Sequence, residues 1–175
     1  TDDGREYVIT RPDTPKPWAN VICPGEYGTI VTQAGTGYSW MTHATLNRIT
    51  RWEQDLVRDE WGKHIYCRDR RSGKAWSLAW QPMRSRPTRY ECRHGVGYTT
   101  ITSVNSGIES RYTVFVPPGD SIEIWRISLR NLGRTERALD LMTYLEWNLG
   151  PAPDTHREFH RLFIEQEFVS GAHAL

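Results

Sequence analysis

Apolar and polar residues alternate along most of the chain with the two-residue period of half-buried β-strands. The alternation is clearest in the second half, where Gly-containing turn sequences separate the strand-like runs. No run has the periodicity of an amphipathic helix, so the pattern predicts an all-β fold, an antiparallel β-sandwich in a single domain spanning residues 1–175. The runs expected as strands are residues 5–10, 28–32, 38–41, 64–68, 75–80, 90–93, 98–105, 108–117, 121–131, 137–147 and 159–168.

Residues 26–52 form the centre of this pattern. Two strand-like runs are joined by a Gly-containing turn at residues 34–37, and an extended segment follows that ends in Arg48, Arg51 and Trp52. Hydrogen-bonding groups, cations and aromatic rings alternate in that segment. The pattern is typical of a sugar-facing surface and equally of an ordinary antiparallel sheet edge, and the sequence leaves both interpretations open.

The segments between the runs are expected to be loops. Residues 11–17 contain three prolines, so they are extended and excluded from a central strand. Residues 18–23 lead into a Pro-Gly turn. The charged residues 53–63 are expected to form a single helical turn or an excursion loop, and residues 81–88 a basic loop.

Composition narrows the classes of partner. The net charge of +1 comes from 22 cationic and 21 anionic residues, which argues against a nucleic-acid-binding surface. No apolar run approaches the roughly 20 residues of a membrane span. The eight Trp and eight Tyr serve cores and ring-stacking surfaces alike. Cys23, Cys67 and Cys92 lie far apart, so we expect neither a metal site nor a disulfide framework, and a reducing cytoplasm fits best.

The residues that could carry chemistry form no recognisable active site. His156 and His160 are four apart, but the segment is not expected to be helical and further ligands are missing, so no metal is expected. Two carboxylate pairs are candidates for acid–base chemistry, and solvated surface charge is the favoured interpretation of both. The pairs are Asp120 with Glu123 and Glu91 with Glu109.

Several segments together carry a family resemblance. They are residues 5–18 (REYVITRPDTPKPW), 35–40 (GTGYSW), 47–52 (NRITRW), 65–69 (IYCRD) and 144–147 (YLEW). The series resembles the N-terminal β-sandwich of the glycoside phosphorylases of glycoside hydrolase family 94, formerly glycosyltransferase family 36. That sandwich is a supersandwich, similar to galactose mutarotase. Residues 157–163 look most like the cellobionic acid phosphorylase branch.

The resemblance implies a longer parent enzyme that cleaves a β-glucosidic disaccharide with inorganic phosphate. It inverts the anomeric centre and releases α-glucose 1-phosphate and an acceptor sugar or aldonate. No metal or organic cofactor is implied. The catalytic Asp lies in an (α/α)6 barrel expected downstream, so the resemblance places no catalytic residue in this chain.

The resemblance also implies roles for the sandwich itself. Such a domain packs on its own barrel, helps form a homodimer, and lends a loop to the acceptor-sugar site of the partner subunit. That loop corresponds to residues 148–161, where an arginine is suited to an aldonate carboxylate, or pairs with a neighbouring glutamate instead. The polar side chains available to the acceptor are Asn148, Arg157, Glu158, His160 and Arg161, and the residues expected to pack the domain on its barrel are Arg48, Arg51 and Trp52.

Two other functions stay open at this stage. A stand-alone carbohydrate-binding module would use Trp40, Trp52 or Trp80. A mutarotase-like enzyme would need a histidine and a carboxylate in one cleft, for instance His94 with Glu91 or Glu109, and fold alone does not decide between these functions.

Overall fold

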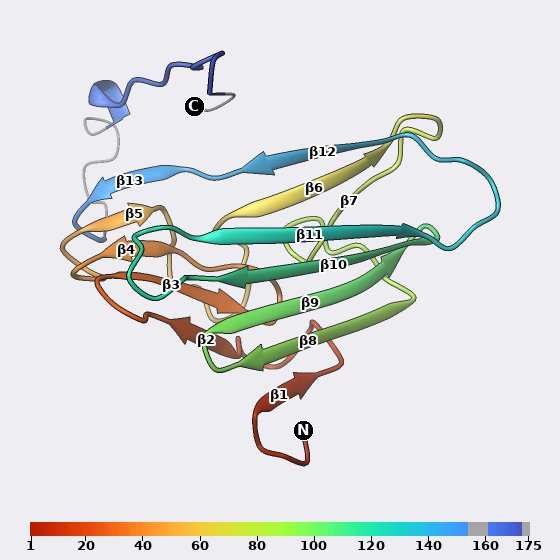
Figure 1. Cartoon of the computed structure of the whole chain (residues 1–175), viewed down its shortest axis with the longest axis horizontal. Coiled ribbons are helices and arrows are strands. Elements are labelled where there is room, and N and C mark those ends of the chain that lie inside the picture. The colour runs from red at the N-terminus through yellow and green to blue at the C-terminus, as the bar shows by residue number, and fades with distance from the viewer. Residues whose placement is uncertain (154–160, 173–175) are drawn as a thin grey trace.

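The computed structural model describes residues 1–153 and 161–172, in which thirteen strands form three antiparallel sheets. One short 3-10 helix, η1 (Arg161–Phe163), completes the described elements (Figure 1). The predicted all-β class is therefore confirmed. No helix in these two ranges is long and apolar enough to cross a membrane.

The first sheet is five-stranded and is built mainly from consecutive hairpins (Figure 1). Its register places Cys92 opposite Ile101 and Ile101 opposite Tyr112, so these three side chains share one face. In spatial order its strands are β1 (Glu6–Ile9), β8 (Arg89–Gly95), β9 (Tyr98–Asn105), β10 (Ile108–Phe115) and β11 (Ile124–Asn131).

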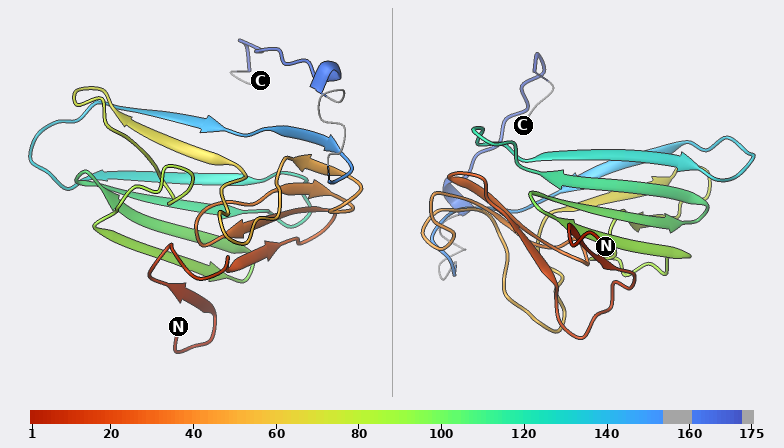
Figure 2. Two further views of the ribbon diagram at one scale, coloured as in Figure 1. Left: turned by 180° about the vertical axis from the view of Figure 1, so that it is seen from behind. Right: turned by 60° about the horizontal axis from the view of Figure 1, so that its bottom comes forward.

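The other two sheets together form the opposing layer (Figures 1 and 2). The second sheet has the order β12 (Leu139–Tyr144), β6 (His64–Asp69) and β7 (Ala75–Ser77). The third sheet has the order β13 (Trp147–Gly150), β5 (Arg48–Thr50), β4 (Ser39–Met41), β3 (Tyr27–Thr32) and β2 (Ala19–Ile22).

The core lies between these layers. Ile101 and Tyr112 of the first sheet pack in one cluster with Val31 of the third sheet and with Ile65 and Trp76 of the second. All five are at most 5% exposed. The apolar positions of the two-residue alternation therefore correspond to the inner faces of the sheets. Burial of these side chains holds the layers together.

Most predicted strands lie within two or three residues of their expected bounds. The turn predicted at residues 34–37 is confirmed, with the Thr32 amide donating to the Thr36 carbonyl at 2.9 Å. Residues 53–63 contain a single turn, in which the Asp59 amide donates to the Asp55 carbonyl at 2.9 Å. Two strands were not predicted. β2 follows the proline-rich segment directly and pairs with β3 along its whole length, and β5 lies in the segment that was expected only to be extended.

Two predictions were wrong. The run at residues 137–147 is not one strand, because it divides between β12, which pairs with β6, and β13, which pairs with β5. The strand predicted for residues 159–168 is absent from the described residues 161–168, which begin with η1 and pair with no sheet. Phe163 is 83% exposed there. The alternating residues of this segment have no neighbouring strand to pair with among the described residues, so the alternation alone does not make them a strand.

Candidate functional site

The pairing of β13 with β5 brings together residues that the sequence predicted for two different roles. Trp147 lies opposite Thr50 and Gly150 opposite Arg48. The start of the proposed acceptor loop therefore lies beside the residues predicted to pack the domain on its barrel. Between them is a hollow of about 450 Å³ lined by Arg48, Arg51, Trp52, Glu53, Gln54, Asn148, Ala152 and Pro153.

Arg48 and Trp52 enclose the ring of Tyr38. The Arg48 guanidinium carbon lies 4.0 Å from the centre of that ring, and the Trp52 ring lies 5.2 Å from it. Arg48 also donates to the carbonyl of Trp52 at 3.1 Å. The Trp52 indole nitrogen is buried and has no hydrogen-bond partner among the described residues. These contacts fix the end of β5 against the β3–β4 hairpin.

Arg51 is buried, with a side chain 6% exposed, and is held by two carboxylates. Its guanidinium donates to Glu146 at 2.7 Å and to Glu53 at 2.8 Å, and lies 4.1 Å from the ring centre of Trp61. Burial opposes the charge, but these hydrogen bonds outweigh it and raise the pKa of Arg51. Glu146 occupies the break between β12 and β13, so Arg51 anchors the point where the chain changes sheet.

The first residues of the proposed acceptor loop are tied to the sandwich. The Asn148 side chain is buried and donates to the carbonyls of Gly150 at 2.8 Å and Pro151 at 3.2 Å. The amide of Ala152 donates to the carbonyl of Thr45 at 2.7 Å. Arg161 is the first residue of η1. The other candidates, Arg157, Glu158 and His160, lie outside the described residues, as does His156.

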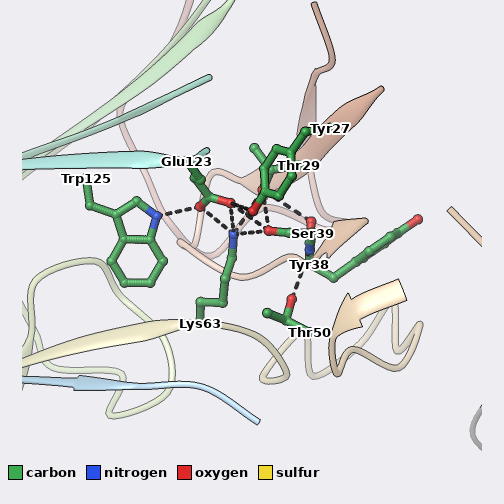
Figure 3. Close-up of polar contacts among 8 residues, drawn as sticks. All are labelled: Tyr27, Thr29, Tyr38, Ser39, Thr50, Lys63, Glu123 and Trp125. Atoms are coloured by element: carbon green, nitrogen blue, oxygen red, sulfur yellow. Dashed lines mark hydrogen bonds and ion pairs between the residues drawn. The ribbon is translucent and has the colours of Figure 1, made fainter. Parts of the chain in front are cut away.

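A second group of polar side chains, which we call the Lys63 cluster, lies between the layers (Figure 3). It consists of Lys63, Glu123, Thr29, Ser39, Tyr27 and Trp125. Lys63 immediately precedes β6 and Glu123 immediately precedes β11, so the cluster joins all three sheets. No local sequence pattern indicates this pairing, because its two charges meet only through the tertiary fold.

Every polar atom at the centre of the Lys63 cluster has a partner. Lys63 Nζ donates to Glu123 Oε2 at 2.6 Å, to Ser39 Oγ at 2.7 Å and to Thr29 Oγ1 at 3.0 Å. Ser39 Oγ donates to Glu123 Oε2 at 2.6 Å, and the Trp125 indole donates to Glu123 Oε1. The interpretation of Glu123 as a solvated surface charge was therefore wrong, since its side chain is only 7% exposed.

The electrostatics of the cluster follow from burial and pairing. Burial lowers the pKa of Lys63, partly opposed by the charge of Glu123. Burial alone would raise the pKa of Glu123, but the charge and hydrogen bonds of Lys63 outweigh it and lower that pKa. Burial and the nearby Glu123 raise the pKa of Tyr27 to about 12. The ion pair is enclosed and saturated, so it fixes the layers and leaves no group for proton transfer to a substrate.

The histidine–carboxylate pairs of the mutarotase-like hypothesis do not form. His94 is on the inner face of β8, and its ring nitrogens lie 2.9 Å from Thr99 Oγ1 and 3.1 Å from the Trp18 carbonyl. Glu91 and Glu109 have the opposite parity in the paired strands, so they are on the outer face. Because side chains on opposite faces of one sheet cannot form one catalytic cleft, the structure contradicts the mutarotase-like hypothesis for these pairs.

The remaining sequence candidates have ordinary environments. Trp40 is buried against Gly28, so its ring offers no exposed face, whereas Trp52 and Trp80 are half-buried. Within residues 1–153 and 161–172, no group of three or more His, Cys, Asp or Glu side chains could hold a metal ion.

Comparison with known proteins identifies relatives for almost the whole chain. The family model described as "Glycosyl hydrolase 94, supersandwich domain" matches residues 5–175. The N,N'-diacetylchitobiose phosphorylase of Vibrio proteolyticus is 35% identical over 149 residues, which cover 84% of this chain and 19% of that protein.

Two further relatives extend the range of named activities. The 3-O-beta-D-glucopyranosyl-beta-D-glucuronide phosphorylase of Paenibacillus borealis is 37% identical over 81% of this chain and 17% of its own length. The solabiose phosphorylase of the same organism is 32% identical over 85% of this chain and 20% of its own length. The chain thus spans about a fifth of the length of these relatives.

Proposed function

Since the chain belongs to the supersandwich domain family of glycosyl hydrolase 94, we propose that it is the non-catalytic N-terminal domain of an inverting glycoside phosphorylase. The observation that carries the proposal is the family match over residues 5–175, together with relatives that are named phosphorylases. The enclosed Lys63 cluster supports the non-catalytic role, because its charges are already paired with each other.

In this proposal the whole protein converts a β-glucosidic disaccharide and inorganic phosphate into α-glucose 1-phosphate and an acceptor. An (α/α)6 barrel downstream supplies the general acid and the phosphate site, and residues 1–175 form one domain that packs on it. Inorganic phosphate is a co-substrate, and neither metal nor organic cofactor takes part. The free thiols of Cys23, Cys67 and Cys92 support a cytoplasmic location.

We further propose that residues 148–161 reach the acceptor site of the partner subunit in a homodimer. The pairing of β13 with β5 and the bond from Ala152 to Thr45 hold the base of this loop on a rigid support. Because Asn148 donates to Gly150 and Pro151 through its amide nitrogen, its side-chain oxygen is the group suited to accept a hydrogen bond from a sugar hydroxyl. Arg157, Glu158, His160 and Arg161 supply the remaining polar groups.

The nature of the acceptor is the finer part of the proposal. An arginine in the loop suits a carboxylate on the acceptor through charge-assisted hydrogen bonds. One relative is named for a glucuronide, which carries a carboxylate, and another for N,N'-diacetylchitobiose, which carries none. We propose an acceptor with a carboxylate, such as an aldonate, on the strength of Arg157 and Arg161.

Arg48, Arg51 and Trp52 are proposed to support the contact with the barrel. Arg51 is already held by Glu53 and Glu146, so its contribution is to fix the surface around the 450 Å³ hollow. Trp52 lines that hollow with a half-buried ring, so it contributes apolar surface to the proposed contact.

The test of the proposal is phosphorolysis by the full-length protein. Incubation with phosphate and cellobiose, cellobionate or N,N'-diacetylchitobiose is expected to release a sugar 1-phosphate from at least one of them. The 175-residue chain alone is expected to release none. Turnover by the chain alone, or failure of the full-length protein on a broad β-disaccharide panel, would overturn the proposal.

The dimeric arrangement has a separate test. A variant with the barrel's general acid removed and an Arg161→Gln variant are each expected to be impaired. If the loop acts in trans, co-expressed hybrid dimers recover activity in one of their two sites. Hybrids with no more activity than the mean of the two parent dimers would exclude the in-trans loop.

A further inference from the structure

A hollow of about 580 Å³ opens at one edge of the sandwich, and we call it the Trp18 hollow. It lies beside β1 and β2, which are end strands of two different sheets, and beside the turn between β8 and β9 (Figure 1). The volume falls within the range of roughly 300–1,000 Å³ that is typical of small-molecule sites. Its lining includes Arg5, Tyr7, Trp18, Asn20, His94 and Val96.

Two aromatic side chains of this lining are exposed although they belong to the inner side of the sandwich. Tyr7 lies opposite His94, so both side chains are on the same face of the first sheet. His94 is 7% exposed there, whereas Tyr7 is 72% exposed. Trp18 has the same parity as Asn20, which lies opposite the core residue Val31, and it is 50% exposed. The hollow therefore offers two ring surfaces that the described residues leave largely open.

A chain of hydrogen bonds fixes the polar groups of the hollow. The Trp18 carbonyl can only accept, so His94 Nε2 donates to it at 3.1 Å, and Nδ1 of the same ring accepts from Thr99 Oγ1 at 2.9 Å. Burial lowers the pKa of His94, which agrees with a neutral ring. Thr99 Oγ1 in turn accepts from the Asn20 amide nitrogen at 3.1 Å. These bonds join the two layers, so the groups are in place without a ligand.

Asn20 leaves one hydrogen-bonding atom free. Its amide nitrogen also donates to the carbonyls of Gly95 at 2.9 Å and Tyr98 at 2.8 Å. Because carbonyls can only accept, these two contacts determine which end of the amide is the nitrogen and which is the oxygen. The oxygen accepts no hydrogen bond from the described residues and is not among their buried unpaired atoms, so it can be reached from solvent.

The ligand chemistry follows from these groups. Open aromatic rings fit the C–H face of a sugar ring, and the Asn20 oxygen requires an O–H or N–H donor. Arg5 is exposed and lies 3.6 Å from Asp3 through its Nε, so its guanidinium has further N–H groups for a ligand oxygen. A pyranose presents C–H faces together with hydroxyl groups that both donate and accept, whereas a purely apolar ligand would leave the Asn20 oxygen without a donor.

We propose that the Trp18 hollow binds one pyranose ring, with a C–H face of the sugar on Tyr7 or Trp18 and a sugar hydroxyl donating to Asn20 Oδ1. The inference does not rest on the phosphorylase role, because every residue it uses belongs to one chain and none lies in residues 148–161. It gives the domain a sugar-binding surface of its own.

The test is a titration of the full 175-residue chain, labelled with ¹⁵N at the tryptophan indoles, with methyl β-D-glucopyranoside, cellobiose and sorbitol. Saturable shifts are expected at the Trp18 indole signal with both sugars, and a Trp18→Leu sample identifies that signal by its disappearance. Sorbitol carries hydroxyl groups but no ring face, so it is expected to bind at least about tenfold more weakly. The titration of the unmodified chain does not depend on the folding of any variant.

Two variants make the assignment specific. Tyr7→Leu is expected to weaken sugar binding at least about threefold, a loss comparable to one aromatic contact. Because Tyr7 is mostly exposed, its replacement is expected to leave the fold intact. Phe163→Leu is the matched control, since Phe163 is also exposed and does not line this hollow.

Three results would overturn the proposal: no saturable shift with either sugar, equal binding of sorbitol, or equal affinity of the Tyr7→Leu and Phe163→Leu variants. Phosphorolysis by the full-length protein is measured separately, so failure here leaves that function standing.

Discussion

Lys63 Nζ donates to Glu123 Oε2 at 2.6 Å, although the two residues are 60 positions apart in the sequence. Each side chain is 7% exposed, and the polar side chains around them come from β3, β4 and β11 (Figure 3). The pair therefore determines how the layers of the sandwich meet. Loss of one partner alone is costly, because the other ion would then be buried without its countercharge.

Removal of one partner should destabilise the chain strongly. We expect Glu123→Gln to lower the free energy of unfolding by about 3–5 kcal/mol, since it leaves the Lys63 ammonium buried and uncompensated. Denaturant unfolding followed by tryptophan fluorescence measures this. The matched control is Asp13→Asn, which removes an exposed partner of Arg11 and should leave the stability nearly unchanged. Equal effects of the two variants would contradict the structural role of the cluster.

The replacement of both ions should cost much less than the loss of either. We expect the double variant Lys63→Met/Glu123→Leu to recover most of the stability lost in Glu123→Gln, because it removes the desolvated charges together. A double-mutant cycle by the same denaturation measurement gives the coupling energy. Additive losses would show that the two side chains do not act as a pair.

The stability should depend on pH through His64. Burial lowers its pKa to about 4 in the folded state, against 6.5 for the free side chain. Between these two pH values the unfolded chain therefore binds more protons than the folded chain. The contribution of neutral His64 to the free energy of unfolding is complete above about pH 6.5 and is lost as the pH falls toward 4. The shift corresponds to about 3 kcal/mol at most, at roughly 1.4 kcal/mol per pKa unit.

The measurement is the stability of wild type and His64→Phe at several pH values. The free energy of unfolding of wild type, relative to that of His64→Phe, should fall as the pH falls from 6.5 to 4. A constant difference across this window would show that His64 is not held neutral in the fold.

Asp59 should give a pH dependence of the opposite sign. Its pKa is raised from 3.8 mainly by burial, partly opposed by hydrogen bonds from Thr36 and Thr32. A raised carboxyl pKa contributes stability that is present below pH 3.8 and is lost as the pH rises through the folded-state value. The free energy of unfolding of wild type, measured relative to that of Asp59→Asn, should therefore be lower at pH 7 than at pH 4. A relative value that is higher at pH 7 would contradict this assignment.

The close approach of Gly37 to the carbonyl of Ile30 should make the turn after β3 intolerant of a side chain at residue 37. Gly37 has φ 135°, and a Cβ there would collide with the carbonyl of Ile30. Gly97 also has a positive φ, 81°, but a Cβ there meets open space. Gly37→Ala should lower the unfolding free energy at least about twice as much as Gly97→Ala, which carries only the backbone strain of about 1–2 kcal/mol. Thermal unfolding of both variants decides this, and similar losses would contradict the collision.

The fold class followed from the sequence, because strand alternation and turn residues are local signals. The hairpin of β9 and β10 shows this, since its predicted range matches β9 and overlaps β10 throughout. The break between Tyr144 and Trp147 was not predictable in the same way. It depends on β6 and β5 as separate pairing partners and on Arg51, which donates to Glu146 from 95 positions away.

The candidate site was predictable only through resemblance. Asn148 and Arg48 were proposed for different roles, and their shared hollow appears only once β13 pairs with β5. Glu123 was misjudged because nothing beside it in the sequence announces Lys63. A carboxylate between a turn and a strand has the same local pattern whether its partner is water or a buried ammonium.

The most direct test of the central claim is ³¹P NMR of the full-length protein with inorganic phosphate and the β-disaccharide panel, run beside the 175-residue chain. The account predicts a new α-sugar 1-phosphate signal with the full-length protein and none with the chain alone. Release of free sugar without a phosphate ester, a β-configured product, or turnover by the chain alone would contradict it.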